Sequence, residues 1–299
     1  MNHNLPIAPF FLSLLGAAIA GTAPIFVRLS EVGPTATGFY RFAFAVPLLA
    51  AWWLWSLNQP KPTVNTVKPN PGVQGYVLIM IAGVLFGIDV AMWNYSINHT
   101  TVANASMLAN LSSIYVSVVS WLLWREHLSI RFIIGMLLAL AGCAILIGLN
   151  FSFQRANIVG DMLALLASAT FGTYMLVMRK LRAYFITPKI MTLSATTSAI
   201  VLYAIGTVMC ENFVPVSSIG WATLLGLAWI TMVLAHGMIS WATAYVTPSL
   251  TTVGMLIQPA IGTMIAWIML NESLNHEQLL GIVAIMAGVW LARRGSLSE

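Results

Sequence analysis

The chain has 299 residues, of which 59% are hydrophobic and only 7% are charged, with 13 Lys and Arg against 8 Asp and Glu. A soluble domain typically has about 25% charged residues, and a mean hydropathy of +0.88 is too high for a water-exposed surface. The composition therefore excludes a soluble protein and predicts a polytopic membrane protein. Cys143 and Cys210 both lie in apolar runs, which leaves no disulfide framework and no metal-binding cluster.

A run of about 20 mostly apolar residues is long enough to cross a bilayer as a helix. The sequence contains ten such runs, and their continuous rather than alternating hydrophobicity favours helices over a barrel. We therefore expect an all-α integral membrane protein with spans at 7–28, 35–57, 75–98, 102–124, 130–149, 157–179, 188–210, 218–244, 248–270 and 276–293. The longest gap, 58–74, is rich in proline and is expected to be an extended linker.

The distribution of cations predicts the orientation of these spans. With ten spans both termini lie on one side, and that side has ten of the 13 cations: Lys61, Lys68, Arg125, Arg131, Arg179, Lys180, Arg182, Lys189, Arg293 and Arg294. The other side has Arg28, Arg41 and Arg155. Because cytoplasmic loops are enriched in Lys and Arg, we expect both termini to be cytoplasmic, in the inner membrane. The net charge of +5 then reflects topology and gives no reason to expect nucleic-acid binding.

The two halves of the chain repeat each other. The segment 125–146 matches 271–292 with Glu126/Glu272, Gly135/Gly281 and Gly142/Gly288 identical, and 12–28 matches 163–179 with Arg28/Arg179 identical. We therefore expect a first five-helix repeat at 1–149 and a second at 150–299. Because five is odd, the second repeat must be inverted in the membrane, as in many secondary transporters whose substrate site lies between the halves.

The Arg41-Phe42 pair at the start of span 2, and the Glu-x-Leu that precedes a glycine-rich span in both halves, resemble EamA-type members of the drug/metabolite transporter superfamily. The resemblance covers essentially the whole chain and is greatest to bacterial aromatic amino acid exporters. It implies a ten-helix carrier of small metabolites, with two inverted repeats around a central cavity. One departure is that Pro259 fits the family's span-9 proline whereas the aligned residue in span 4 is Ser113, so the two helices are not expected to kink alike.

Asp89 is the only acid well inside a predicted span. Ionisable residues within membrane spans are costly and commonly functional, so Asp89 is a candidate for proton coupling or for binding a substrate ammonium. The alternative is a structural partner of neighbouring polar groups. Phe86, Asp89 and Trp93 share one helical face, which places two aromatic rings beside the carboxylate.

His236 is the second candidate for proton coupling, on a face with Trp229 and Ser240. Span directions place Asp89 toward the periplasm and His236 toward the cytoplasm. At a rise of ~1.5 Å per residue they would differ by roughly 10 Å in depth, at opposite ends of one cavity. A satisfied core histidine is the alternative interpretation.

Span 4 carries a polar stripe of Ser106, Asn110, Ser113 and Ser117. It is interpreted either as part of the substrate pathway or as interhelical contact between small polar residues. The aligned positions in span 9 begin with Thr252. Gln258 is a further pathway candidate, but this alignment points it away from the face of Asn110.

The charge pattern also predicts the substrate. Arg28, Arg41 and Arg179 are placed at span ends, which leaves no cation at the midplane for a phosphorylated substrate. One acid, one histidine, amides, hydroxyls and aromatic rings favour an amino acid or a similar small metabolite. The alternatives are a passive facilitator or channel of the same fold, and an intramembrane enzyme, for which Ser240 lacks a nucleophile motif. We expect no catalytic residues, cofactor or metal, and a monomer suffices for the pathway.

Overall fold

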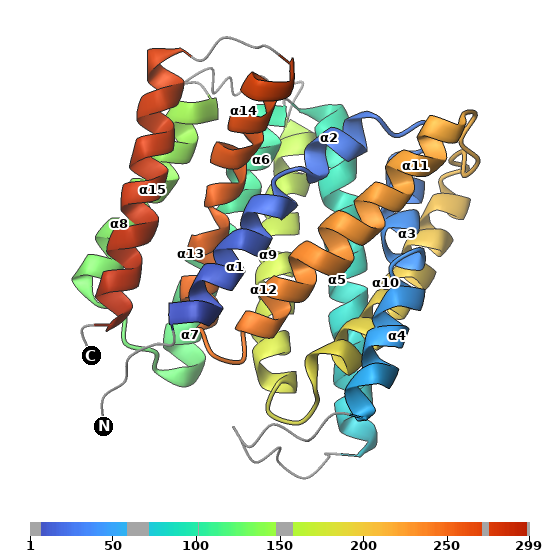
Figure 1. Ribbon diagram of the computed structural model, residues 1–299, viewed down its shortest axis with the longest axis horizontal. Helices are drawn as coiled ribbons and strands as arrows, with labels where there is room; N and C mark the ends of the chain where they lie inside the picture. The colour runs from blue at the N-terminus through green and yellow to red at the C-terminus, as the bar shows by residue number, and fades with distance from the viewer. Residues whose placement is uncertain (1–6, 59–71, 101, 148–157, 271–274, 298–299) are drawn as a thin grey trace.

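The computed structural model describes residues 7–58, 72–100, 102–147, 158–270 and 275–297, and these residues contain helices and no strand. Figure 1 shows the helices packed roughly along one direction, with both termini at the lower end. The elements are α1 (Ile7–Ala20), α2 (Ala23–Arg28), α3 (Pro34–Ala43), α4 (Val46–Leu57), α5 (Val73–His99), α6 (Val102–Asn110), α7 (Ser112–Trp124), α8 (Ile130–Ile147), α9 (Ile158–Leu181), α10 (Thr187–Val208), α11 (Ser218–Gly226), η2 (Leu227–Ala235), α12 (His236–Ala242), α13 (Pro248–Met255), α14 (Ile257–Leu270) and α15 (His276–Leu297).

Seven helical stretches of the described chain are long and apolar enough to cross a membrane: Ala8–Arg28, Val73–Ile97, Ala105–Trp124, Ile158–Leu181, Thr187–Val208, Ser218–Ala242 and His276–Ser296. The remaining three expected spans fall on α3 with α4, on α8, and on α13 with α14, whose individual helices are shorter. The count of ten spans therefore stays a prediction. The proline-rich linker lies mostly at 59–71, outside the described residues.

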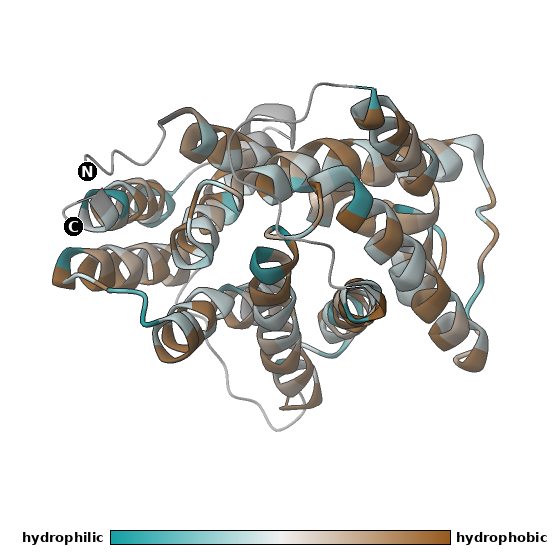
Figure 2. Ribbon diagram, turned by 90° about the horizontal axis from the view of Figure 1, so that it is seen from below, coloured by the Kyte–Doolittle hydropathy of each residue, from teal (hydrophilic) through white to brown (hydrophobic). Residues whose placement is uncertain are grey.

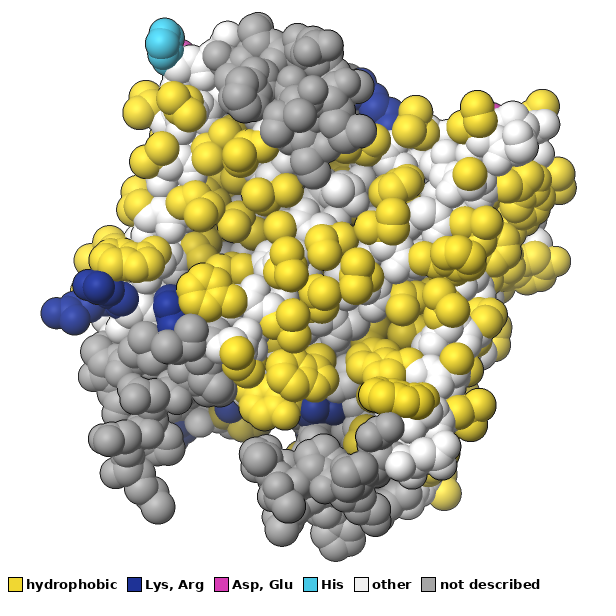
Figure 3. Space-filling model, viewed as in Figure 1, with side chains coloured by type: hydrophobic (Ala, Val, Ile, Leu, Met, Phe, Trp, Pro, Cys, Tyr) yellow, Lys and Arg dark blue, Asp and Glu magenta, His cyan; other side chains and the backbone are white. Residues whose placement is uncertain are grey.

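The outer surface is strongly hydrophobic. Large apolar side chains such as Leu54, Leu122, Val208 and Leu280 are at least 60% exposed, and hydrophobic side chains cover most of the face in Figure 3. Figure 2 shows apolar residues around the helices rather than on one stripe. Because water would not tolerate such a surface, lipid must cover it, and the chain is a multi-pass membrane protein.

α8 and α15 lie side by side at one end of the molecule (Figure 1) and pack through their glycines. A Cβ at Gly135 would lie 2.6 Å from the carbonyl oxygen of Gly288, and a Cβ at Gly142 would lie 2.8 Å from that of Gly281. The contacts are mutual, because a Cβ at Gly288 or at Gly281 would lie at the same distances from the carbonyl oxygens of Gly135 and Gly142. Glycine is therefore required at all four positions so that the two backbones can touch.

The fourth and ninth predicted spans are both interrupted at equivalent places. α6 ends at Asn110 and α7 begins at Ser112, while α13 ends at Met255 and α14 begins at Ile257. At the two breaks, Leu111 and Leu256 donate backbone hydrogen bonds to residues only three positions back. The expectation that these two helices differ because only one contains the proline is wrong, since both are interrupted whether or not Pro259 follows.

The eighth predicted span contains a π-helical segment, η2, between two α-helical parts. A π-helix takes about one more residue per turn than an α-helix. Side chains on either side of η2 are therefore rotated relative to the faces that an ideal α-helix predicts. This segment ends at Ala235, immediately before His236.

Candidate functional site

Two adjoining hollows of about 150 Å³ and 430 Å³ lie between the two halves of the chain. They share the lining residues Pro24, Trp93, Ala109, Asn110 and Gln258, and together form what we call the central cavity. The larger hollow also contacts Ser106, midway along α6, and Thr263, midway along α14, and both helices lie in the upper part of Figure 1. The central cavity therefore extends from the middle of the molecule toward the end opposite the termini.

Asp89, Arg41 and His236 all line the smaller hollow, each from a different helix. Asp89 lies on α5 between Phe86 and Trp93 and is partly exposed to the cavity. The structure thus brings together the two residues that the sequence singled out for proton coupling. Both line this one hollow rather than opposite ends of the central cavity, and the expected difference in their depth stays a prediction.

Arg41 is the residue whose place the sequence misjudged. It was expected at the end of a span, but it lies two turns into α3, is 7% exposed and lines the cavity. Its Nε has no hydrogen-bond partner among the described residues. Arg41 and Asp89 carry opposite charges that interact, but they do not form an ion pair within 4.0 Å. Among the described residues, only Arg179 and Glu126 form such a pair. The signal available from sequence was an arginine in an otherwise apolar run.

His236 is held by its own helix. Its Nδ1 lies 2.9 Å from the carbonyl oxygen of Thr231, five residues earlier in η2. A carbonyl only accepts, so Nδ1 carries the proton and Nε2 of the neutral ring keeps its lone pair. The imidazole ring also lies 5.4 Å from the ring of Phe86, between centroids. The π-helical turn thus fixes both the tautomer and the direction of the ring.

Aromatic side chains form one wall of the central cavity. Phe86, Trp93 and Phe171 line it, and Phe86 is held from behind by Phe42, at 5.0 Å, and by Tyr174, stacked at 4.4 Å. These rings place a flat apolar surface beside Asp89 and Arg41. A ligand that has charged groups and an aromatic or aliphatic side chain would match both parts of this surface.

Among the remaining candidates, Ser106, Asn110, Thr252 and Gln258 line the cavity. Asn110 and Gln258 contact both hollows, so the expectation that they face apart is wrong. The reason is that each lies beside a helix break, which rotates it relative to an ideal helix. Three other candidates, Ser113, Ser240 and Trp229, are not among the lining residues.

Two of these three donate hydrogen bonds to backbone carbonyls, and the third is buried. Ser113 is buried and donates to the carbonyl of Asn110, three residues earlier, at 2.9 Å. Ser240 is buried. Trp229 is 47% exposed and donates through Nε1 to the carbonyl of Phe44 at 3.2 Å. The π-helical register of η2 turns Trp229 away from the face of His236, which explains the difference from the prediction.

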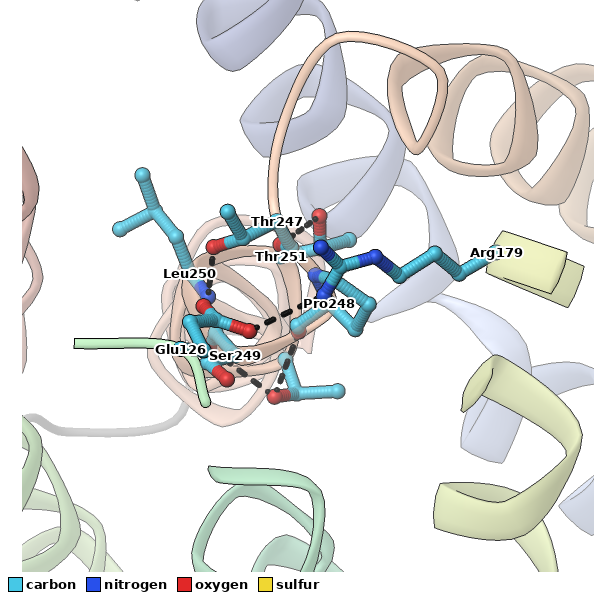
Figure 4. A network of polar contacts seen from close by, with 8 residues as sticks. Glu126, Arg179, Thr247, Pro248, Ser249, Leu250 and Thr251 are labelled. Carbon is cyan, nitrogen blue, oxygen red and sulfur yellow. Dashed lines mark hydrogen bonds and ion pairs between the residues drawn. The ribbon is translucent and has the colours of Figure 1, made fainter. Parts of the chain in front are cut away.

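At the lower end of the molecule the ends of α7 and α9 lie beside the start of α13. Arg179 donates to Glu126 at 3.1 Å and stacks over the ring of Trp124 at 4.8 Å. Figure 4 shows this ion pair beside the first turn of α13, where Thr247 caps the amide of Leu250.

These features define a multi-pass membrane protein with a central cavity lined by charged, polar and aromatic side chains, which is the form of a small-molecule transporter. The chain belongs to the EamA-like transporter family, which matches it twice, over residues 8–148 and 158–294.

Comparison with known proteins agrees with this assignment. The chain is 26% identical over 285 residues to a protein of Archaeoglobus fulgidus that is named an uncharacterized transporter, covering 89% of this chain and 91% of that protein. It is 23% identical over 199 residues to the probable amino-acid metabolite efflux pump of Salmonella typhimurium, covering 62% of this chain and 66% of that protein. A crystal structure with 17% sequence identity superimposes with a TM-score of 0.79 over 95% of this chain and 96% of that one, which shows a shared fold.

Proposed function

We propose that the protein is a secondary transporter that exports neutral and aromatic amino acids across the cytoplasmic membrane by alternating access. The observation that supports this most is the central cavity, where Asp89 and His236 face the aromatic wall of Phe86 and Trp93. The name of the Salmonella typhimurium relative, a probable amino-acid metabolite efflux pump, points to the same substrate class.

The packing of α8 against α15 supports an inverted repeat. Under the duplication Gly135 corresponds to Gly281 and Gly142 to Gly288. The contact between Gly135 and Gly288 therefore corresponds to the contact between Gly281 and Gly142, and both are present. A pair of contacts that exchange under the repeat is what a twofold axis between two inverted halves produces.

The positions of the cations support cytoplasmic termini. Arg125, Arg131, Arg179, Lys189 and Arg293 belong to helix ends or connections at the lower end of Figure 1, where both termini lie. Lys61, Lys68 and Arg155 lie outside the described residues. Since cytoplasmic ends are enriched in Lys and Arg, the lower end is assigned to the cytoplasm of the inner membrane.

With that orientation, the central cavity extends toward the periplasm and the Glu126–Arg179 pair closes the cytoplasmic end. An alternating-access carrier requires such a state together with one in which the closure is reversed. The hairpins of α5 with α6 and of α12 with α13 have short connections, which suits movement of each hairpin as a unit.

A passive facilitator or channel of the same fold is the second candidate, and an intramembrane enzyme is a distant third. The test uses purified protein in liposomes with labelled phenylalanine and an imposed pH gradient. A carrier coupled to protons moves phenylalanine against its concentration gradient, whereas a facilitator only equilibrates it. Robust transport of a sugar phosphate with none of phenylalanine would overturn the proposed substrate class.

A further inference from the structure

We propose that Arg41 binds the carboxylate and Asp89 the ammonium of one and the same substrate molecule, so that the central cavity selects zwitterions. This inference rests on the proposed function and names the chemistry by which the site recognises an amino acid. It also gives a role to Arg41, which was expected at the edge of the membrane.

The Arg41 side chain is buried at the cavity with a donor left unpaired by the described residues. Pro34 starts α3 and places Arg41 two turns inside the helix, while the next residue, Phe42, is fully buried against Phe86. Arg41 is only 7% exposed, lines the cavity, and leaves its Nε without a partner in the described part of the chain. A guanidinium has five N–H donors in a planar fork that matches a carboxylate in two parallel hydrogen bonds. Arg41 is therefore a buried guanidinium at the cavity with at least one donor, Nε, unpaired among the described residues.

Asp89 does not accept a hydrogen bond from the Arg41 guanidinium. Both residues line the same hollow and their charges interact. They form no ion pair within 4.0 Å, because the one such pair among the described residues joins Arg179 and Glu126. The two residues thus line one hollow without being closed on each other. Space between two opposite charges is what a ligand with two opposite charges would fill.

The ligand that balances the charges of both Arg41 and Asp89 is a zwitterion. An amine without a carboxylate would leave Arg41 unneutralised, and a carboxylate without an amine would leave Asp89 unneutralised. Uncompensated charge in a low-dielectric site is strongly unfavourable. A zwitterion compensates both, and its side chain meets the rings of Phe86, Trp93 and Phe171. A phosphorylated substrate would bring a dianion beside Asp89 and is disfavoured for that reason.

The experiment compares three ligands that share one aromatic ring: phenylalanine, phenethylamine, which lacks the carboxylate, and 3-phenylpropionate, which lacks the ammonium. Binding of each to the purified full-length protein is measured by titration calorimetry. Arg41→Gln is expected to weaken the binding of phenylalanine and of 3-phenylpropionate by about ten- to hundredfold, the range for a lost charge-assisted hydrogen bond. The same substitution should leave the binding of phenethylamine unchanged or make it tighter. Asp89→Asn is expected to weaken the binding of phenylalanine and of phenethylamine and to leave the binding of 3-phenylpropionate unchanged.

Two further variants separate recognition from folding. Arg28→Gln removes an exposed cation from the end of α2 and is expected to leave all three ligands unchanged. Arg41→Lys keeps the buried charge but not the planar fork of donors. Its affinity for phenylalanine is expected to lie between those of the wild type and of Arg41→Gln. Retained phenethylamine binding by Arg41→Gln shows that the site is folded.

If Arg41→Gln leaves the binding of phenylalanine unchanged, or weakens the binding of phenethylamine as much as that of 3-phenylpropionate, Arg41 is not the carboxylate site. The inference is then overturned while the proposed function stands. If the wild type binds no amino acid at all, the proposed function itself fails, and the inference fails with it.

Discussion

Glu31 and Glu211 cap each other's helices across the two halves of the chain. Glu31, in the connection before α3, accepts hydrogen bonds at 2.9 Å from the amides of Val216 and Ser217, at the start of α11. Glu211, in the connection before α11, accepts from the amides of Thr35 and Ala36 at 2.8 and 2.9 Å, at the start of α3. Each carboxylate thus satisfies amide groups at the N-terminus of the other's helix, and the two repeats are joined at their upper end.

This arrangement predicts a pH-dependent stability. The Ser217 hydroxyl, and then the amides of Ser217 and Val216, stabilise the Glu31 carboxylate and lower its pKa from the ordinary value of 4.5. A group whose pKa is lower in the folded state stabilises the fold above the unfolded pKa and loses that contribution as the pH falls. The melting temperature of purified wild type should therefore fall more than that of Glu31→Gln as the pH is lowered from 6 to about 3, with the difference developing below the unfolded value of 4.5. Parallel curves for the two proteins would show that this cap does not stabilise the fold.

The ion pair at the lower end predicts a shift between conformations. Arg179 is 32% exposed and Glu126 12% exposed, so Arg179→Gln should weaken the closed end by about 0.2–1 kcal/mol, which is up to about fivefold in population. The measurement is maleimide labelling from the cytoplasmic side of Ser249→Cys, a buried position in the first turn of α13, with Cys143 and Cys210 replaced by alanine.

The neighbouring substitution Lys180→Gln removes an exposed cation from the same helix end and should leave labelling unchanged. Equal labelling of the Arg179→Gln and Lys180→Gln proteins would rule out the ion pair as a closure of this end.

The contact between α8 and α15 predicts a severe effect of a small substitution. A Cβ at Gly288 would lie 2.6 Å from the carbonyl oxygen of Gly135, so Gly288→Ala should force the helices apart and destabilise the protein by about 1–3 kcal/mol. Gly237→Ala is the control, because its Cβ meets only Trp52, at an ordinary 3.7 Å. Alanine is also the better helix former, so Gly237→Ala should melt at or above the wild-type temperature. A Gly288→Ala protein as stable as wild type would contradict the close packing.

Proton coupling predicts a separation of two activities in Asp89→Asn. Asparagine resembles the protonated carboxyl and still forms hydrogen bonds, but it cannot exchange a proton. Gradient-driven export of phenylalanine in liposomes should be abolished, while exchange of labelled for unlabelled phenylalanine at saturating concentration should persist. If full gradient-driven export remains, Asp89 is not the coupling site, and His236, which lines the same hollow, is the next residue to replace.

Several features of this protein could be predicted before any packing was known. Composition identifies a membrane protein, because 7% charged residues cannot form a water-exposed surface. Matched glycines at a constant offset predict that the two halves repeat each other, whereas the contact of α8 with α15 through those glycines is seen only in the structure. Asp89 was recognisable as a cavity residue because a carboxylate inside an apolar span is costly unless it faces a polar cavity or a partner.

Which residues meet at the site depends on the tertiary structure. Sequence spacing assigns a helical face on the assumption of an unbroken α-helix, and η2 and the breaks at Leu111 and Leu256 violate that assumption. Trp229 is turned out and Gln258 turned in for this reason. Arg41 and His236 reach the same hollow as Asp89 because helices of both repeats converge there, and that convergence depends on packing between distant segments, which no local pattern in the chain records.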